Sequence, residues 1–441
     1  MRLTLPTTGT PQAWSDPASY WPALSAAVAD RPGPLVTLDA AALEHNAGDL
    51  LRRAGGLPVR VATKSVRSRP VLQAVLGLPG YAGVLAYTLP EALWAAGWCD
   101  DVVLGYPTAD RVAVARLLGD ERACRRVTLM VDSAEHLDLV DSVAGAGARP
   151  EVRVALDLDL SYEPPRAGRL TGRVGVYRSP VATAAQAREL ARQVLARPGF
   201  RLVGVMGYEA QLAGVGDALA GTGGPLARAR SAAADARTLL VRRLQAASWQ
   251  DVLERRAVMV AAVREVVESA GGTLEFVNGG GTGSLHLTRQ DPSVTEVAAG
   301  SGLFGPTLFD RYRAFSPAPA TAFALPVVRR PGAGVATVLG GGWVASGPPG
   351  HDRLPTPVWP PDVSLVTHEG AGEVQTPLRG PGARDLRVGD LTWWRHAKAG
   401  ELCEHTDELV VVRPRTAAGA TTAAEVEDVV PTYRGEGKAF L

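Results

Sequence analysis

Val59–Arg67 (VRVATKSVR) is a short β-branched run that carries a lysine, Lys64, at its end. Similar runs recur along the chain, and Ala- and Leu-rich helical patterns separate most of them. Alternating strands and helices are typical of βαβ units, and eight such strands predict an α/β fold, a closed (β/α)₈ TIM barrel. The predicted strands are Arg60–Lys64, Gly83–Thr88, Asp101–Tyr106, Val127–Asp132, Glu151–Asp159, Leu202–Glu209, Leu274–Gly279 and Val294–Ala298.

Helical patterns lie between these strands. The longest, Leu226–Ala270, contains neither Gly nor Pro and is predicted to be helical throughout. Ser248 followed by Asp251 predicts a capping box that opens its second half. The shorter predicted helices are Pro70–Leu78, Pro90–Gly97, Ala109–Leu118, Ala134–Val143 and Ala182–Ala196.

The texture of the chain changes after about Phe315, where Pro and Gly multiply and strand-like runs appear without helices between them. These runs include Thr321–Val328, Val335–Leu339 and Leu409–Val412, which predict an all-β domain. The early strand Leu35–Leu38 precedes the barrel series and is expected to pair with that domain. The predicted organisation is an N-terminal segment, 1–38, that joins the β domain, a barrel over 39–314 and the β domain over 315–441.

Composition restricts the class of partner. The 441 residues carry a formal net charge of +1 and no basic cluster, so we expect a small-molecule partner, and neither nucleic acid nor a membrane. Cys99, Cys124 and Cys403 are scattered and predict no disulfide framework, which favours a reduced, cytoplasmic location. We find no signal-peptide pattern and no apolar run near ~18 residues.

Lys64 is a candidate catalytic residue because the C-terminal ends of barrel strands form the active face. A barrel interior desolvates an ammonium, lowers its pKa and frees the amine to attack an aldehyde. The chain contains only three lysines and a large excess of arginine, so a lysine that is retained in an apolar stretch suggests a need for an amine there. The alternative is a surface lysine that pairs with a carboxylate.

Two glycine-rich turns follow the seventh and eighth predicted strands: Asn278–Ser284 (NGGGTGS) and Gly300-Ser301-Gly302. Barrels commonly bind phosphate at these two loops, where backbone N–H groups point at the anion and hydroxyl groups add donors. A single turn of this kind has weak specificity, but two on adjacent strands favour a phosphate site. The candidate cofactor-binding residues there are Gly280, Gly281, Thr282, Gly283, Ser301 and Gly302.

From about residue 35 onward these segments resemble the alanine-racemase-like, fold-type III enzymes that use pyridoxal 5′-phosphate (PLP), and in particular the branch of D-threonine aldolase and eukaryotic-type D-serine dehydratase. In that branch the cofactor lysine lies in a segment like RPHxKTHK. Lys64 aligns with the Schiff-base lysine, whereas Val66 and Arg67 replace the His and the second Lys. Further similar elements are Thr88–Ala92, Asp100–Tyr106, Arg173–Gly175, Tyr208-Glu209, Gly280–Thr282 and Glu296 with Gly300 and Asp310.

The resemblance suggests two further residues for the cofactor. Tyr208 is expected near the barrel mouth, where its ring would contact the pyridine face or its hydroxyl would serve the chemistry; the alternative is a tyrosine of the barrel core. Arg173 is expected to hydrogen-bond the phenolate oxygen of PLP, or to pair with Asp157 or Asp159.

Members of the branch also carry a divalent metal, held by a His-x-Cys or His-x-Asp pair. His396 maps to this place and Cys403 is the predicted second ligand, although it lies several residues further on; Glu401 and His405 are the alternatives. A His and a Cys suit zinc, and a manganese- or magnesium-class ion is the other option. His368 resembles a histidine near the metal and is expected to act in acid–base chemistry.

The resemblance implies a metal-assisted PLP lyase that acts on D-configured β-hydroxy amino acids, by aldol cleavage or by dehydration and deamination. PLP acts as the electron sink, and the protein selects which bond at Cα breaks. Two alternatives remain: an amino-acid racemase, and a non-catalytic PLP-binding homeostasis protein. By analogy we also expect a homodimer.

Overall fold

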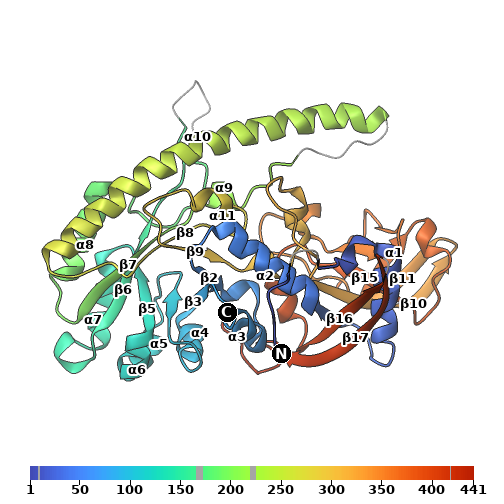
Figure 1. Ribbon diagram of the computed structural model, residues 1–441, viewed down its shortest axis with the longest axis horizontal. Coiled ribbons are helices and arrows are strands. Elements are labelled where there is room, and N and C mark those ends of the chain that lie inside the picture. Colours follow the sequence, from blue (N-terminus) through green and yellow to red (C-terminus); the bar gives the residue numbers. More distant parts are fainter. Residues whose placement is uncertain (8–9, 165–171, 219–224, 418) are drawn as a thin grey trace.

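Eight parallel strands close into a barrel in the computed structural model, which describes residues 1–7, 10–164, 172–218, 225–417 and 419–441, without the side chains of 225–237 (Figure 1). The predicted barrel is thereby confirmed, with each strand at its predicted place. The boundaries differ by one or two residues at most strands, and one difference matters for the site: β2 ends at Ala62, so Lys64 lies in the 3₁₀ turn η2 (Thr63–Ser65) that follows. The barrel strands are β2 (Val59–Ala62), β3 (Tyr81–Ala86), β4 (Val102–Leu104), β5 (Val127–Val131), β6 (Val152–Leu158), β7 (Phe200–Gly207), β8 (Phe276–Gly279) and β9 (Glu296–Ala299).

The barrel interior is filled by side chains. Phe276 lies across it, and Gly204 on the neighbouring strand leaves room for that ring, since a Cβ at position 204 would lie 2.3 Å from Phe276 Cζ. Burying apolar side chains on both faces of parallel strands is what stabilises such a barrel. The buried interior cluster consists of Val103, Met130, Ala155, Val203, Met206 and Phe276.

Helices cover the outside of the barrel (Figure 1). The longest, α10 (Pro225–Ser269), is one uninterrupted helix, so the capping box predicted at Ser248 is wrong. Ser248 is buried, and its Oγ accepts a hydrogen bond of 2.9 Å from Nε2 of Gln211 and does not cap a helix start. The other helices that follow the N-terminal segment are α2 (Ala40–Ala54), α3 (Arg69–Leu76), α4 (Leu89–Ala95), α5 (Arg111–Leu118), α6 (Glu121–Arg126), α7 (Ala134–Val143), α8 (Ala184–Leu195), α9 (Ala210–Ala213) and α11 (Leu285–Thr288).

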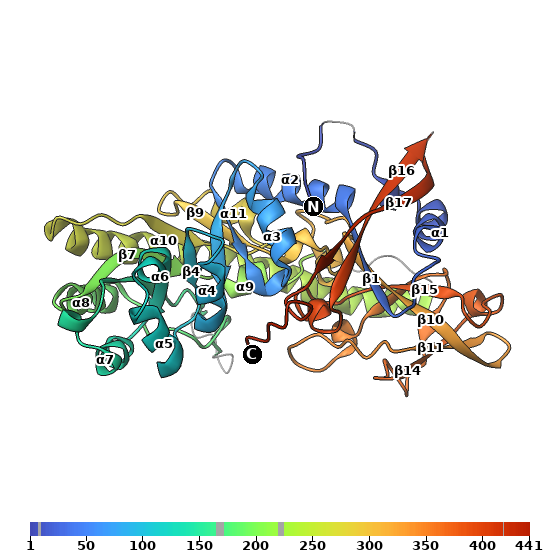
Figure 2. The same cartoon turned by 90° about the horizontal axis from the view of Figure 1, so that it is seen from below.

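A second, nine-stranded sheet lies beside the barrel (Figure 2). The N-terminal strand β1 (Leu35–Asp39) belongs to it and pairs antiparallel with β10 (Thr321–Gly332) and parallel with β16 (Glu408–Ala417). Helix α1 (Pro17–Ala27) packs on this sheet through Trp21, whose ring stacks on Trp393. The remaining strands are β11 (Val335–Leu339), β12 (Thr356–Trp359), β13 (Ser364–Leu365), β14 (Gln375–Arg379), β15 (Leu391–Arg395) and β17 (Ala420–Pro431).

Within the described part of the chain, no helix combines the length and the apolar character needed to cross a membrane.

Candidate active site

A cavity of about 370 Å³ lies where the carboxyl ends of the barrel strands face the second sheet domain. This volume falls in the range of ordinary small-molecule and cofactor sites, and the position is the one that barrels use for chemistry. Its polar lining from the barrel includes Lys64, Tyr106, Arg178, Tyr208, Thr282 and Ser301, and that from the sheet domain includes Ser346, Arg353, Lys398 and Glu401.

Lys64 lines this cavity from η2, directly after β2. The turn is held by Thr63 Oγ1, which donates to the Leu85 carbonyl at 3.1 Å, and by Arg67 Nε, which donates to the Lys64 carbonyl at 3.0 Å. The Lys64 side chain is exposed and not desolvated by packing, because it projects into the cavity. Among the described residues Lys64 makes no ion pair with a carboxylate, so the alternative of a paired surface lysine does not describe it.

Tyr106, which follows β4, is the partner of Lys64. The Lys64 Nζ and Tyr106 Oη atoms lie 2.6 Å apart. Burial alone would raise the pKa of the Tyr106 phenol, but the charges of Lys64 and Arg178 outweigh burial and the pKa is lowered. Tyr106 is not among the site residues predicted from the sequence. Its position at the end of a barrel strand was the available signal.

The two predicted glycine-rich turns meet at Thr282. Its Oγ1 accepts hydrogen bonds from Ser301 Oγ at 3.3 Å and from the Gly302 N–H at 3.1 Å. Gly280, Gly281, Thr282 and Ser301 line the cavity, whereas Gly283 and Gly302, also predicted to bind the cofactor, are buried and do not line it. Gly283 has no room for a side chain, since a Cβ there would lie 2.2 Å from the Ala213 carbonyl oxygen.

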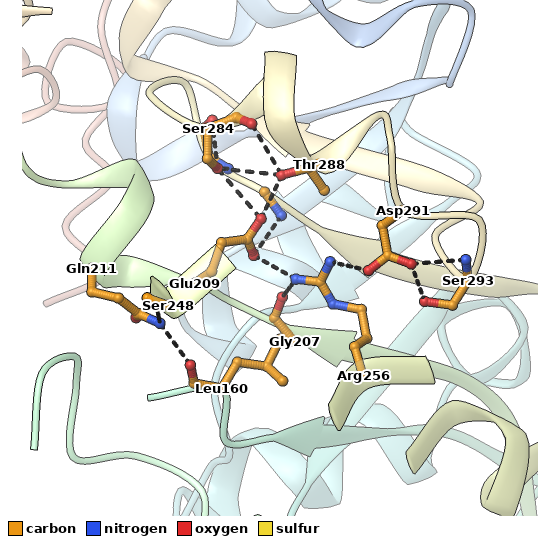
Figure 3. A network of polar contacts seen from close by, with 12 residues as sticks. Leu160, Gly207, Glu209, Gln211, Ser248, Arg256, Ser284, Thr288, Asp291 and Ser293 are labelled. Atoms are coloured by element: carbon orange, nitrogen blue, oxygen red, sulfur yellow. Dashed lines mark hydrogen bonds and ion pairs between the residues drawn. The ribbon is translucent and has the colours of Figure 1, made fainter. Parts of the chain in front are cut away.

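A buried ion-pair network supports this turn from below (Figure 3). We call Glu209, Arg256 and Asp291 the Glu209 network. The Arg256 guanidinium, on α10, pairs with Glu209 at 2.8 Å and with Asp291 at 2.9 Å, and the three side chains are at most 1% exposed. Glu209 in turn accepts hydrogen bonds from the Gly280 N–H at 3.1 Å and from the Thr288 hydroxyl. The first of these bonds fixes the backbone of the glycine-rich turn. The Glu209 network therefore positions this turn, although its own side chains do not line the cavity.

Tyr208 lies beside Glu209 and lines the cavity, where burial raises the pKa of its phenol to about 12. The Arg178 guanidinium lies over the rings of Tyr208 and Tyr106, at 5.1 and 5.3 Å from their centroids. Arg173 does not reach the cavity lining. It pairs with Asp159 at 2.7 Å, which is the alternative the sequence analysis left open, and Arg178 is the arginine of this segment that the analysis missed.

The sheet domain contributes the turn that carries Lys398 and Glu401. Gly400 adopts a φ of +107°, and a Cβ there would lie 2.1 Å from the Lys64 carbonyl oxygen, so the turn is pressed against η2. Lys398 Nζ donates to Ser346 Oγ at 3.3 Å, and Glu401 accepts from the Ser346 N–H at 3.1 Å. The pKa of the Lys398 ammonium is lowered, chiefly by burial; the Glu401 carboxylate opposes this shift, and the charge of Lys64 adds to it.

The predicted metal ligands belong to no cluster of three donors in the described part of the chain. His396 is buried, its Nε2 has no hydrogen-bond partner among the residues that the structure describes, and burial lowers its pKa to about 3, so its neutral imidazole would suit a metal. Cys403 is buried in the hydrophobic core, where burial raises the thiol pKa to about 12 and keeps the thiol protonated. Glu401 bonds Ser346, and His405 stacks on a tryptophan ring. His396 and Cys403 therefore lack, among the described residues, the third protein donor that zinc sites usually have.

His368, the predicted acid–base residue, is exposed in the segment after β13 and does not line the cavity. The structure therefore does not place this residue at the cavity, because it lies in the connection between β13 and β14, at the edge of the sheet domain.

Comparison of the whole fold with solved structures shows what this arrangement is similar to. D-threonine aldolase from Filomicrobium marinum superposes with a TM-score of 0.71 at 20% identity, covering 92% of this chain and 96% of the other. This chain has the alanine racemase-like, fold-type III architecture. For D-threo-3-hydroxyaspartate dehydratase from Delftia sp. HT23 the TM-score is 0.62 at 19% identity, covering 90% and 97%. For alanine racemase from E. faecalis it is 0.52 at 14%, covering 82% and 87%.

No protein-family model matches the sequence, and no curated protein matches it significantly. At such low identities the likeness to solved structures establishes the alanine racemase-like fold and nothing finer.

The residues of this alanine racemase-like chain fit PLP. Lys64 supplies an amine that lines the cavity, and the turns joined at Thr282 line the same cavity with backbone and hydroxyl groups suited to a phosphate. Tyr208 and Arg178 also line this cavity.

Proposed function

We propose that this protein is a PLP-dependent lyase that acts on D-configured β-hydroxy amino acids, by aldol cleavage or by dehydration. The observation that carries the proposal is the pairing of the Lys64 amine with Tyr106, at 2.6 Å, in the cavity that the two glycine-rich turns also line. Two of the named structural neighbours act, by their names, on D-threonine and on D-threo-3-hydroxyaspartate, and these names support the substrate class.

The chain's own residues have distinct parts in this proposal. Lys64 holds the cofactor covalently, and the turns joined at Thr282 hold its phosphate. PLP, when bound, supplies the electron sink for breaking a bond at the substrate Cα. The Tyr106 hydroxyl moves a proton to or from Nζ of Lys64, for which its lowered pKa suits it. Arg178 places a positive charge at the barrel wall, where a substrate carboxylate is attracted.

The divalent metal of the sequence-based expectation is not part of this proposal, because the His396 and Cys403 side chains do not form a ligand set with a third donor among the described residues. The proposal does include a homodimer, by analogy with the fold. Sedimentation of the active enzyme as a monomer in analytical ultracentrifugation would contradict that part.

Product identification tests the proposal. The purified holoenzyme is incubated with D- and L-threonine, D-serine and D-threo-3-hydroxyaspartate, with and without added divalent metal. Glycine with an aldehyde identifies an aldolase, and a keto acid with ammonia identifies a dehydratase.

The controls are Lys64→Ala, which should be inactive, and Lys438→Gln, which lies outside the cavity lining and should retain activity. Interconversion of D- and L-forms alone would instead identify a racemase. Absence of turnover with every substrate, despite bound cofactor, would favour the non-catalytic alternative.

A further inference from the structure

The charged side chains that line the cavity are strongly unbalanced. Lys64, Arg67, Arg178, Arg353 and Lys398 are cationic, whereas Glu401 is the one carboxylate among the described lining residues. An excess of like charge in a partly enclosed space is unfavourable unless an anionic ligand neutralises it. A phosphate at the glycine-rich turns would offset part of this excess, and Lys64 would be taken up by the cofactor. Arg178, Arg353 and Lys398 are the lining cations that remain, since the donors at those turns are backbone and hydroxyl groups.

Apart from Lys64 and Arg67, the cations of the lining form two groups on opposite domains. Arg178 belongs to the barrel and lies over tyrosine rings. Lys398 and Arg353 belong to the sheet domain. Among the described residues, neither Arg178 nor Lys398 has a carboxylate within ion-pair distance, and Arg353 pairs only with its neighbour Asp352, leaving its buried Nε without a partner. Arg67 differs from these, since it pairs with Glu404.

The position of Lys398 is set by the fold. The close approach of Gly400 to the Lys64 carbonyl holds the turn against η2, so the second lysine of the cavity is kept near the first. Burial lowers the pKa of Lys398, the nearby Glu401 carboxylate raises it, and the charges of Lys64 and Arg353 lower it, so all three charged groups lie near this lysine. Two of the three lysines in the chain therefore line one cavity.

We infer that Lys398 and Arg353 form an anion subsite for a second carboxylate, on the side chain of the substrate, while Arg178 serves the carboxylate on Cα. This inference rests on the proposed function and narrows its substrate class to dicarboxylic amino acids. A charge-assisted hydrogen bond to a carboxylate in such a site is worth roughly a tenfold change in affinity or more.

The test uses two unreactive probes of nearly equal shape, succinate and its monoamide succinamate, because they differ by one carboxylate and contain no amine that could react with the cofactor. Their affinities for the purified holoenzyme are measured by isothermal titration calorimetry. Succinate is expected to bind about tenfold more tightly than succinamate. Lys398→Gln is expected to remove that preference, and Lys438→Gln, a lysine outside the cavity lining, to retain it.

Three results would overturn the inference: equal affinity for the two probes in the unaltered protein, an unchanged preference in Lys398→Gln, or an equal loss for both probes, which would assign Lys398 to the carboxylate they share. Should Lys398→Gln misfold by circular dichroism, Arg353→Gln must reduce the same preference. Failure of the proposed function is distinguishable, because a protein without turnover can still discriminate between these probes.

Discussion

Charged side chains occur in two contrasting settings in this protein. In the Glu209 network every charge is buried and has an opposite charge within 2.9 Å. At the cavity, Lys64, Lys398 and Arg178 are accessible and have no carboxylate partner among the described residues. A buried ion pair is tolerated only when its charges are satisfied, and its worth lies in fixing geometry. The contrast teaches that the paired charges shape the site and that the unpaired ones are left for its ligands.

The largest effect is expected for Lys64→Ala. Removing the amine that holds the cofactor should reduce kcat/KM by at least ~10³-fold, since the covalent step is lost. The purified variant should also lose the visible absorbance of bound cofactor after gel filtration. Retention of both properties would place the chemistry on another residue.

Breaking the Glu209 network should lower the stability of the fold, because its side chains are buried and do not line the cavity. Arg256→Met leaves the Glu209 carboxylate buried without its cation and should cost about 3–5 kcal/mol in the free energy of unfolding. The matched control is Arg415→Met, which breaks an exposed pair with Glu425 and should cost about 1 kcal/mol or less. Chemical denaturation measures both, and equal costs would contradict the distinction between buried and exposed pairs.

Tyr106→Phe tests the hydrogen bond at the cavity. Loss of the hydroxyl beside Lys64 should lower kcat/KM by about 10²-fold, the usual contribution of a positioned acid or base. The fold should be unaffected, because the phenyl ring remains. Unchanged kinetics with unchanged cofactor absorbance would assign the proton transfer elsewhere.

His396 predicts how stability depends on pH. Its pKa is lowered by burial to about 3, so between pH 6.5 and that value the unfolded chain binds a proton that the folded chain does not. Stability is therefore complete above pH 6.5 and falls with decreasing pH, by about 2 kcal/mol near pH 5 from this group. Urea unfolding at several pH values measures this dependence. The free energy of unfolding should change less steeply with pH in His396→Leu than in the unaltered protein, and an identical dependence in the two would contradict the assignment.

The sequence predicts the barrel well because the signal is local and repeated. Each strand is a short apolar run, and its partners are its neighbours along the chain, as with β5 and β6. The glycine-rich turns were found for the same reason, since their residues follow strands directly. The pairing of Arg173 with Asp159, one of the two predicted alternatives, was also found, because Asp159 lies at the end of the predicted strand that precedes Arg173.

Several of the misses are residues whose role depends on distant contacts. Lys398 reaches the cavity because Gly400 packs against Lys64, more than 300 residues earlier in the chain, and no local pattern reports such an approach. Cys403 matched a metal ligand by type, but packing buries it in the hydrophobic core. Ser248 and Asp251 matched a helix start, yet α10 continues through them. The local sequence shows which residue types are present. Only the tertiary fold determines which of their side chains come into contact.

The central claim is that Lys64, and not the neighbouring Lys398, holds PLP. Reduction of the holoenzyme with borohydride fixes the cofactor to its lysine, and peptide mass spectrometry then locates the modification. We predict the adduct on the peptide that contains Lys64, with Lys398 unmodified. An adduct on Lys398, or none on either lysine, would contradict the account.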